Sequence, residues 1–207
     1  RILSVFQGQS ALPKEVWSMI ASSSSSSSST PIRESQIDGG EASTSPEHQR
    51  LLANALFQGK AVPRDEDRAW NLWKEAAERG DLPSKYSVAM GILSGKPIDL
   101  QKGATSPAEE ACRMLREIVG MPTPSDPLEI ETKANAAFAL GTVLEKSGDE
   151  KASMDSYEQS ARLGNAAACF RVGEAMRRRS DDEAARRWFE RGGKDAECLH
   201  ALSVMWT

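Results

Sequence analysis

The chain has 207 residues, a formal net charge of -4 and an isoelectric point near 5.4. This length suits one sizeable domain with an appended tail, and the acidic balance argues against a protein that coats nucleic acid over its whole surface. No apolar run approaches the roughly 20 residues that a membrane-spanning helix needs, so we expect no membrane span.

Residues 1–46 differ in composition from the rest of the chain. Eight consecutive serines, Ser22 to Ser29, precede a run rich in Gly, Ser, Thr and Pro that ends at Pro46. Such a segment buries too little apolar surface to offset its chain entropy. The composition predicts a flexible or extended N-terminal arm.

A short amphipathic helix is predicted near residues 12–21 of this arm. Its apolar residues recur at helical spacing: Leu12, Val16, Trp17 and Ile20. Two interpretations stay open. The helix is either transient or folded back on the domain, or it is a tethered anchor that docks on a partner through Trp17 and Ile20.

The stretch from Gly59 to Gly80 combines a turn, a helix start, an amphipathic helix and a stop. Acidic residues at 65–67 suit the positive end of a helix that begins near Asp65, and Gly80 suits its C-terminal end. Between them lies one apolar stripe at helical period, formed by Ala69, Trp70, Leu72, Trp73, Ala76 and Ala77. A helix this short needs a neighbouring helix to cover its tryptophans.

Parts of this pattern recur along the chain after Pro46. A branched apolar residue followed by a small one marks a first helix in each unit: Leu52-Ala53, Val88-Ala89, Leu140-Gly141, Val172-Gly173 and Leu202-Ser203. A small residue at a fixed helical position lets a neighbouring helix approach closely. The second helices of the units are marked by Trp73, Leu115, Tyr157 and Trp188-Phe189. The interval between the second and third markers carries two loops, Pro97 to Pro107 and Gly120 to Pro127, and the prolines of the latter exclude helix.

The pattern G-x-x-V-P-x-D-x-x-x-A-x-x-L-W-x-x-A-A-x-x-G at Gly59 to Gly80, with its preceding helix, resembles the Sel-like repeat, a relative of the tetratricopeptide repeat. The match is strong there, moderate around Tyr157 to Gly173 and weaker at Cys112 to Gly120. The resemblance implies an all-α, right-handed α/α solenoid of antiparallel helix pairs over residues 47–207. It also implies an adaptor or assembly scaffold.

Few residues suit catalysis or metal binding. The only histidines, His48 and His200, lie far apart in the repeats, and no Gly-rich phosphate loop follows a strand. We therefore predict no catalytic residues, metal, cofactor or small-molecule substrate, and hence no enzyme. Acidic groups at 65–67 and 181–183 precede helices and are interpreted as N-terminal caps. The cysteines lie in apolar helical stripes and are interpreted as small core residues: Cys112, Cys169 and Cys198.

An arginine-rich region near the C-terminus is a candidate contact surface. Its members are Arg171, Arg177, Arg178, Arg179, Arg186, Arg187 and Arg191. Carboxylates interrupt them, so one interpretation is a solvated, salt-bridged face. The other is a patch that contacts phosphate or an acidic protein surface, with Arg171, Arg178, Arg186 and Arg187 as candidate residues.

The last predicted helix carries an apolar stripe that includes Cys198, Leu199, Leu202 and Trp206. Leu199 and Leu202 are expected to pack on the helix of Trp188-Phe189. Because the ends of a solenoid need a polar cap or a neighbour, two outcomes stay open. The terminal helix caps the array itself, or a partner subunit covers an edge that includes Trp206.

Taken together, these features predict a non-catalytic protein–protein interaction scaffold, a subunit or assembly factor of a larger complex whose partners are other protein subunits. The alternative is an accessory protein that contacts RNA in a ribonucleoprotein, such as an organellar ribosome, through Arg171–Arg191. A chain that begins at Arg1 with a serine-rich arm fits a protein from which a targeting segment has been removed, in a mitochondrion or another organelle. Trimming by an experimenter explains Arg1 equally well.

Overall fold

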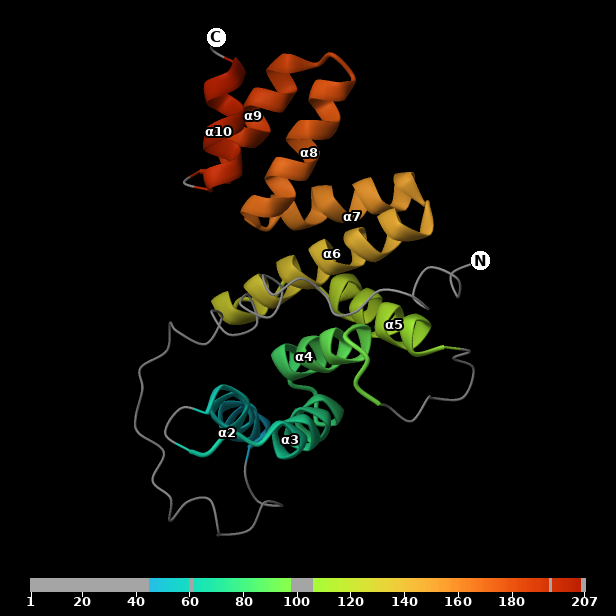
Figure 1. The fold of residues 1–207 in the computed structure, drawn as a ribbon, viewed down its shortest axis with the longest axis vertical. Helices are drawn as coiled ribbons and strands as arrows, with labels where there is room; N and C mark the ends of the chain where they lie inside the picture. Colours follow the sequence, from blue (N-terminus) through green and yellow to red (C-terminus); the bar gives the residue numbers. More distant parts are fainter. Residues whose placement is uncertain (1–44, 60–61, 98–105, 194, 206–207) are drawn as a thin grey trace. The chain divides into compact units, whose positions relative to one another are not determined.

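The computed structural model describes residues 45–59, 62–97, 106–193 and 195–205. Within these ranges all regular secondary structure is α-helical, which confirms the expected all-α fold class of helix pairs (Figure 1). The helices are α2 (Pro46–Gln58), α3 (Glu66–Glu78), α4 (Leu82–Leu93), α5 (Pro107–Gly120), α6 (Pro127–Ser147), α7 (Glu150–Arg162), α8 (Ala166–Arg178), α9 (Asp182–Gly192) and α10 (Ala196–Met205).

The chain divides into two compact units between Met114 and Leu115, inside α5. We call the described residues up to Met114 the N-terminal unit, and those from Leu115 onwards the C-terminal unit. The proposed boundary between an arm of 1–46 and a repeat domain of 47–207 stays a prediction. Trp17, Ile20 and Trp206 lie outside the described residues.

A common turn joins four pairs of consecutive helices, namely α3–α4, α6–α7, α7–α8 and α8–α9. Its first residue has a positive φ, +96° at Gly80, +83° at Gly148, +99° at Gly164 and +62° at Ser180. The residue after it, Asp or Asn, caps the next helix: the Asp181 carboxylate accepts a bond from the Ala184 N–H at 3.0 Å. The Asp181 N–H in turn donates to the Met176 carbonyl at 3.0 Å, closing the preceding helix.

The core of the N-terminal unit forms around the two tryptophans of α3. Trp70 is 6% exposed and Trp73 is 3% exposed, so their predicted structural role is confirmed. The Trp73 Nε1–H donates to the Asn54 Oδ1 on α2 at 3.1 Å. Trp70 packs so closely on α4 that a Cβ added to Gly91 would lie 2.2 Å from its ring.

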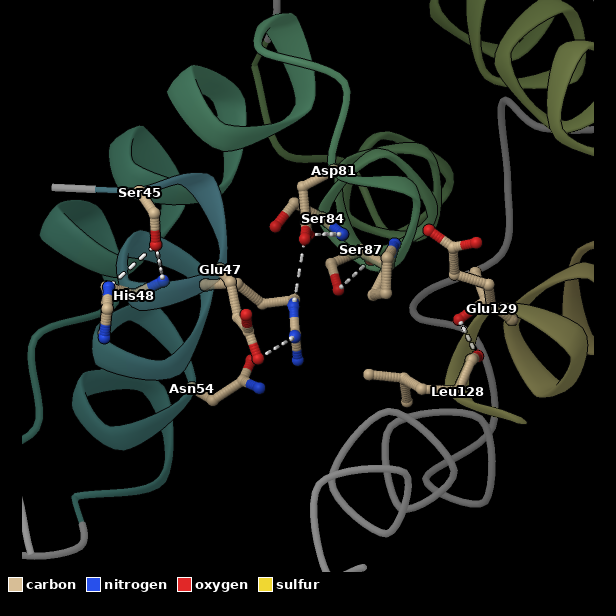
Figure 2. A network of polar contacts seen from close by, with 12 residues as sticks. Ser45, Glu47, His48, Asn54, Asp81, Ser84, Ser87, Leu128 and Glu129 are labelled. Carbon is tan, nitrogen blue, oxygen red and sulfur yellow. Dashed lines mark hydrogen bonds and ion pairs between the residues drawn. The ribbon is translucent and has the colours of Figure 1, made fainter. Parts of the chain in front are cut away.

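A polar network also ties α2 to the turn before α4 (Figure 2). The buried Arg50 donates from Nε to Asp81 Oδ1 at 3.2 Å, while Asp81 Oδ2 accepts the Ser84 N–H at 2.8 Å. One carboxylate thus both caps α4 and pairs with a buried guanidinium. We interpret this network as structural.

In the C-terminal unit, aromatic side chains of the second helices lie over the small residues of the first helices. Tyr157 of α7 covers Gly141 of α6, and Phe189 of α9 covers Gly173 of α8. Phe189 belongs to a buried cluster with Cys169, Val172 and Cys198. The repeat register predicted from the small residues is therefore seen as direct packing within helix pairs.

Candidate functional site

Helix α10 is the element on which apolar side chains are most exposed. Cys198 and Ala201 are buried against the preceding helices, and Leu202 and Met205 pack on the same cluster. Leu199, by contrast, is 51% exposed. Leu202 packs on a cluster that includes Phe189 of α9, as expected from the sequence, whereas Leu199 is about half exposed.

The position of Leu199 in the repeat explains the difference. It lies four residues before the small residue Ser203, on the same face of the helix. In α6 and α8 the corresponding residues are Ala137 and Cys169, and both are completely buried. Their face meets the second helix of the pair, and no second helix covers it on α10 within the described residues.

The helix packing agrees with this assignment. In the pairs α2–α3, α6–α7 and α8–α9, each first helix makes its most extensive contact with the second helix of its own pair. Helix α10 packs mainly on α9 and, less extensively, on α8. It has the contacts of a first helix with its predecessors, and its remaining face is open in the described part of the chain.

The apolar stripe of this helix predicts that Leu199 is packed, and Leu199 is instead about half exposed. The repeat register indicates that Leu199 is unusual. It occupies the position at which the other first helices carry Gln49, Lys85, Ala137 and Cys169. A large apolar residue at this position of the last helix indicates either a covering neighbour or an open face.

The arginine-rich region lies on α8 and α9, and each of its side chains is exposed. Several arginines pair with carboxylates. Arg171 lies 3.7 Å from Glu145, Arg177 lies 3.0 Å from Glu174, and Arg186 lies 3.6 Å from Glu190; Arg187 pairs with Glu183.

The remaining arginines differ from one another. The Arg191 guanidinium donates to the Arg162 carbonyl at 2.9 Å and lies 5.7 Å from the centre of the Trp188 ring. For Arg178 and Arg179 the structure shows no ion pair with any described carboxylate. Much of the face is therefore a set of local ion pairs, and its free charge gathers at the end of α8.

The acidic groups that the sequence assigned to caps occupy cap positions. Asp65 precedes α3 and accepts the Arg68 N–H at 2.9 Å, and Asp181 precedes α9. Glu66, in the first turn of α3, has a pKa below its usual value, chiefly because it accepts a hydrogen bond from Arg64. These carboxylates stabilise helix starts.

The cysteines are buried core residues, as expected. Burial raises the pKa of the Cys198 thiol to about 12, and Asp195 and Cys169 add to the effect. Burial also raises the pKa of Cys169. Such thiols carry little thiolate at neutral pH.

Two further findings concern the described residues as a set. They contain no cluster of three or more His, Cys, Asp or Glu side chains placed to hold a metal ion. None of their helices combines the length and the apolar character required to cross a membrane.

Comparison with known proteins links this arrangement to a repeat family. The Sel1 repeat matches the chain at residues 46–81 and again at residues 161–195. These segments contain the pair α2–α3 and the pair α8–α9. A search of curated proteins finds no match.

Among solved structures, a Sel1 repeat protein from Oxalobacter formigenes is similar, with 17% sequence identity and a TM-score of 0.56. The similarity covers 73% of this chain and 58% of that protein, so the chain spans somewhat more than half of its length. This likeness concerns the fold.

Two immunity proteins of Pseudomonas aeruginosa are more distant. Pa5087 has 14% identity and a TM-score of 0.38, with 79% of this chain and 67% of that chain covered. PA5088 has 13% identity and a TM-score of 0.37, with 79% and 70% covered. At these TM-scores neither protein contributes to the functional argument.

Proposed function

Because the chain is a Sel1-repeat protein, we propose that it is a non-catalytic scaffold that binds other proteins, as a subunit or assembly factor of a larger complex. Sel1 repeats are generally protein–protein interaction modules. The structural observation that supports the proposal is the open face of α10, where Leu199 is 51% exposed at a position that is buried in α6 and α8. Exposed apolar surface rimmed by polar residues is typical of protein-binding sites.

The test is to isolate the chain together with its partners from the source cell. A tagged full-length chain is expected to copurify with another protein in a fixed stoichiometry, and the complex is expected to elute as one species of defined mass in size-exclusion chromatography with light scattering. A stable monomer that retains no protein in such preparations would contradict the proposal.

The second candidate function, contact with RNA in a ribonucleoprotein such as that of an organelle, is supported by the exposed Arg178 and Arg179 at the end of α8. Local carboxylates already pair with Arg171, Arg177, Arg186 and Arg187, which lowers the charge available to a phosphate backbone. If RNA binds, its affinity falls with salt and with the triple change of Arg178, Arg186 and Arg187 to Glu. Absence of RNA binding at low salt removes this candidate.

A further inference from the structure

The turn between α8 and α9 differs from the other turns of its kind at one residue. The α3–α4, α6–α7 and α7–α8 turns place glycine at the position with positive φ, namely Gly80, Gly148 and Gly164. The α8–α9 turn places Ser180 there, the one non-glycine residue with a positive φ in the described part of the chain. A residue with a Cβ adopts this conformation less readily than glycine does. The backbone therefore gives no reason for a serine, which points to a role for its side chain.

The Ser180 hydroxyl is free to react. Ser180 is exposed, and its side chain makes no hydrogen bond with the described residues. Other serines are used by the fold: the exposed Ser147 donates to the Leu144 carbonyl at 2.8 Å, and the buried Ser160 donates to the Ala134 carbonyl at 2.7 Å. The hydroxyl at the α8–α9 turn thus has no structural partner there.

The residues around Ser180 form a pattern of opposite charges. Three arginines precede it and three acidic residues follow it, in the order Arg177-Arg178-Arg179-Ser180-Asp181-Asp182-Glu183. Among the serines and threonines of the whole sequence, only Ser180 has arginine at both the second and the third position before it. Protein kinases of the arginine-directed class select this arrangement, because carboxylates of their substrate cleft pair with the two guanidinium groups.

The arginines before Ser180 are available to such a cleft. Arg178 is exposed and has no ion pair with any described carboxylate. Arg177 pairs with Glu174 at 3.0 Å, but this pair lies at the surface, where an ion pair contributes little and is exchanged at low cost. Both guanidinium groups can therefore turn toward a kinase.

The carboxylates after Ser180 are more committed to the fold. Asp181 caps α9 by accepting the Ala184 N–H at 3.0 Å, and Glu183 pairs with Arg187 one turn further along the same helix. Two of the three acidic residues thus hold the start of α9. This difference favours recognition through the arginines over recognition through the acidic residues.

The segment around Ser180 can open without disturbing the core. Every residue from 177 to 183 is exposed. The turn is closed by hydrogen bonds from the Ser180 N–H to the Arg177 carbonyl at 2.9 Å and from the Asp181 N–H to the Met176 carbonyl at 3.0 Å. Exposed helix ends with few buried contacts open locally at low cost. The acceptor serine can therefore reach a kinase active site while the helices stay packed.

We propose that Ser180 is a phosphorylation site of an arginine-directed serine/threonine protein kinase. The Ser180 Oγ attacks the γ-phosphorus of ATP; the new O–P bond forms as the bond from that phosphorus to the bridging oxygen of ADP breaks, and the hydroxyl proton passes to the base of the kinase. The product carries about −1.5 to −2 charge at neutral pH beside Arg178 and Arg179. The modification thereby offsets the free positive charge at the end of α8.

Phosphorylation of the full chain in vitro tests the proposal. The probe is the catalytic subunit of cyclic-AMP-dependent protein kinase, an arginine-directed enzyme, with magnesium and ATP. Tandem mass spectrometry is expected to place a phosphate on Ser180. Ser180→Gly removes the acceptor and suits the positive φ of the turn, so this variant is expected to stay folded and to lose that phosphate.

Arginine variants identify what the kinase reads. Arg177→Ala combined with Arg178→Ala is expected to lower kcat/KM for phosphorylation of Ser180 at least about tenfold. The control combines Arg116→Ala with Arg162→Ala and is expected to leave it unchanged. Arg116 is exposed on α5, and Arg162 pairs with Glu158 in the last turn of α7, much as Arg177 pairs within α8. Circular dichroism confirms that both double variants are folded.

Three outcomes would overturn the inference. It fails if Ser180 stays unmodified while the same kinase phosphorylates a standard peptide substrate, or if the two double variants are phosphorylated at Ser180 at equal rates. It also fails if only an acid-directed kinase, such as casein kinase 2, modifies Ser180, because the acidic residues 181–183 are then the determinant. Each of these results leaves the scaffold function untouched, since the proposed modification does not depend on a bound partner.

Discussion

Helices α8 and α10 of the C-terminal unit share one sequence register, but their surroundings differ. Cys169 and Gly173 of α8 are buried beneath α9, while Leu199 and Ser203 of α10 are exposed. Each helix also packs on the helix before it. The comparison shows that the repeat pattern specifies the face of a helix that can receive a neighbour, and that the next helix decides whether this face is core or surface.

The largest expected effect on stability comes from removing the side chain of α9 that covers α8. Phe189→Ala removes a completely buried ring from the α8–α9 pair and is expected to lower the free energy of unfolding by about 3–5 kcal/mol. Leu199→Ala, on the exposed face of α10, is the control. It is expected to lower the free energy of unfolding by less than about 0.5 kcal/mol. Urea unfolding monitored by circular dichroism measures both. Similar losses for the two variants would show that α10 is as covered as α8.

Adding a methyl group to the small residue sharpens the same contrast. Gly173→Ala places a Cβ about where the Phe189 ring lies, and the expected loss is about 1–3 kcal/mol, even though Ala favours helix over Gly by about 1 kcal/mol. Ser203→Ala adds no bulk and is expected to change stability by less than about 0.5 kcal/mol. Thermal unfolding of both variants provides the measurement, and a neutral Gly173→Ala would refute the close contact.

The tryptophans of α3 extend the comparison to the N-terminal unit. Trp73→Phe removes the hydrogen bond to Asn54, whereas the buried Trp70 Nε1–H has no hydrogen-bond partner among the described residues. Both changes remove similar volume, so Trp73→Phe is expected to cost about 1 kcal/mol more than Trp70→Phe. Chemical denaturation of both variants measures this difference. Equal costs would mean that the Trp73 hydrogen bond contributes nothing net to stability.

The smallest expected effect concerns the turn between α8 and α9. Ser180 has a φ of +62°, a conformation that costs a residue with a Cβ more than it costs Gly, whereas the corresponding turn before α7 has Gly148 at +83°. Ser180→Gly is therefore expected to raise stability by about 0.5–1 kcal/mol, after allowing for the added freedom of the unfolded chain. Gly148→Ser is expected to lower stability. Thermal melts of the two variants measure the direction of both changes.

Much of the fold could be predicted from local chemistry. A capping residue before a helix and a glycine after it act within one turn of backbone, so Asp65 and Gly80 mark the bounds of α3 without tertiary information. The burial of Trp70 and Trp73 followed from an apolar stripe too large for a short helix to cover alone. The burial of the three cysteines could be predicted from the same helical periodicity.

The candidate site was less accessible to such reasoning. Leu199 and Leu202 share an apolar stripe in the sequence, and both were expected to pack on α9. Leu202 packs on the cluster that includes Phe189, whereas Leu199 is 51% exposed, and helical period alone does not say which of two residues on one face is covered. The ion pairs of the arginine-rich region likewise depend on the positions of carboxylates, which composition alone does not specify.

The sequence by itself determined the helices, their caps, the repeat register and the small residues at which helices approach closely, because each of these depends on interactions within a few residues of chain. Only the tertiary structure decided that Gly173 is covered by Phe189 and that Leu199 is left exposed. Helical period places side chains on a face, but burial requires a second element on that face, and this is a property of the packed molecule.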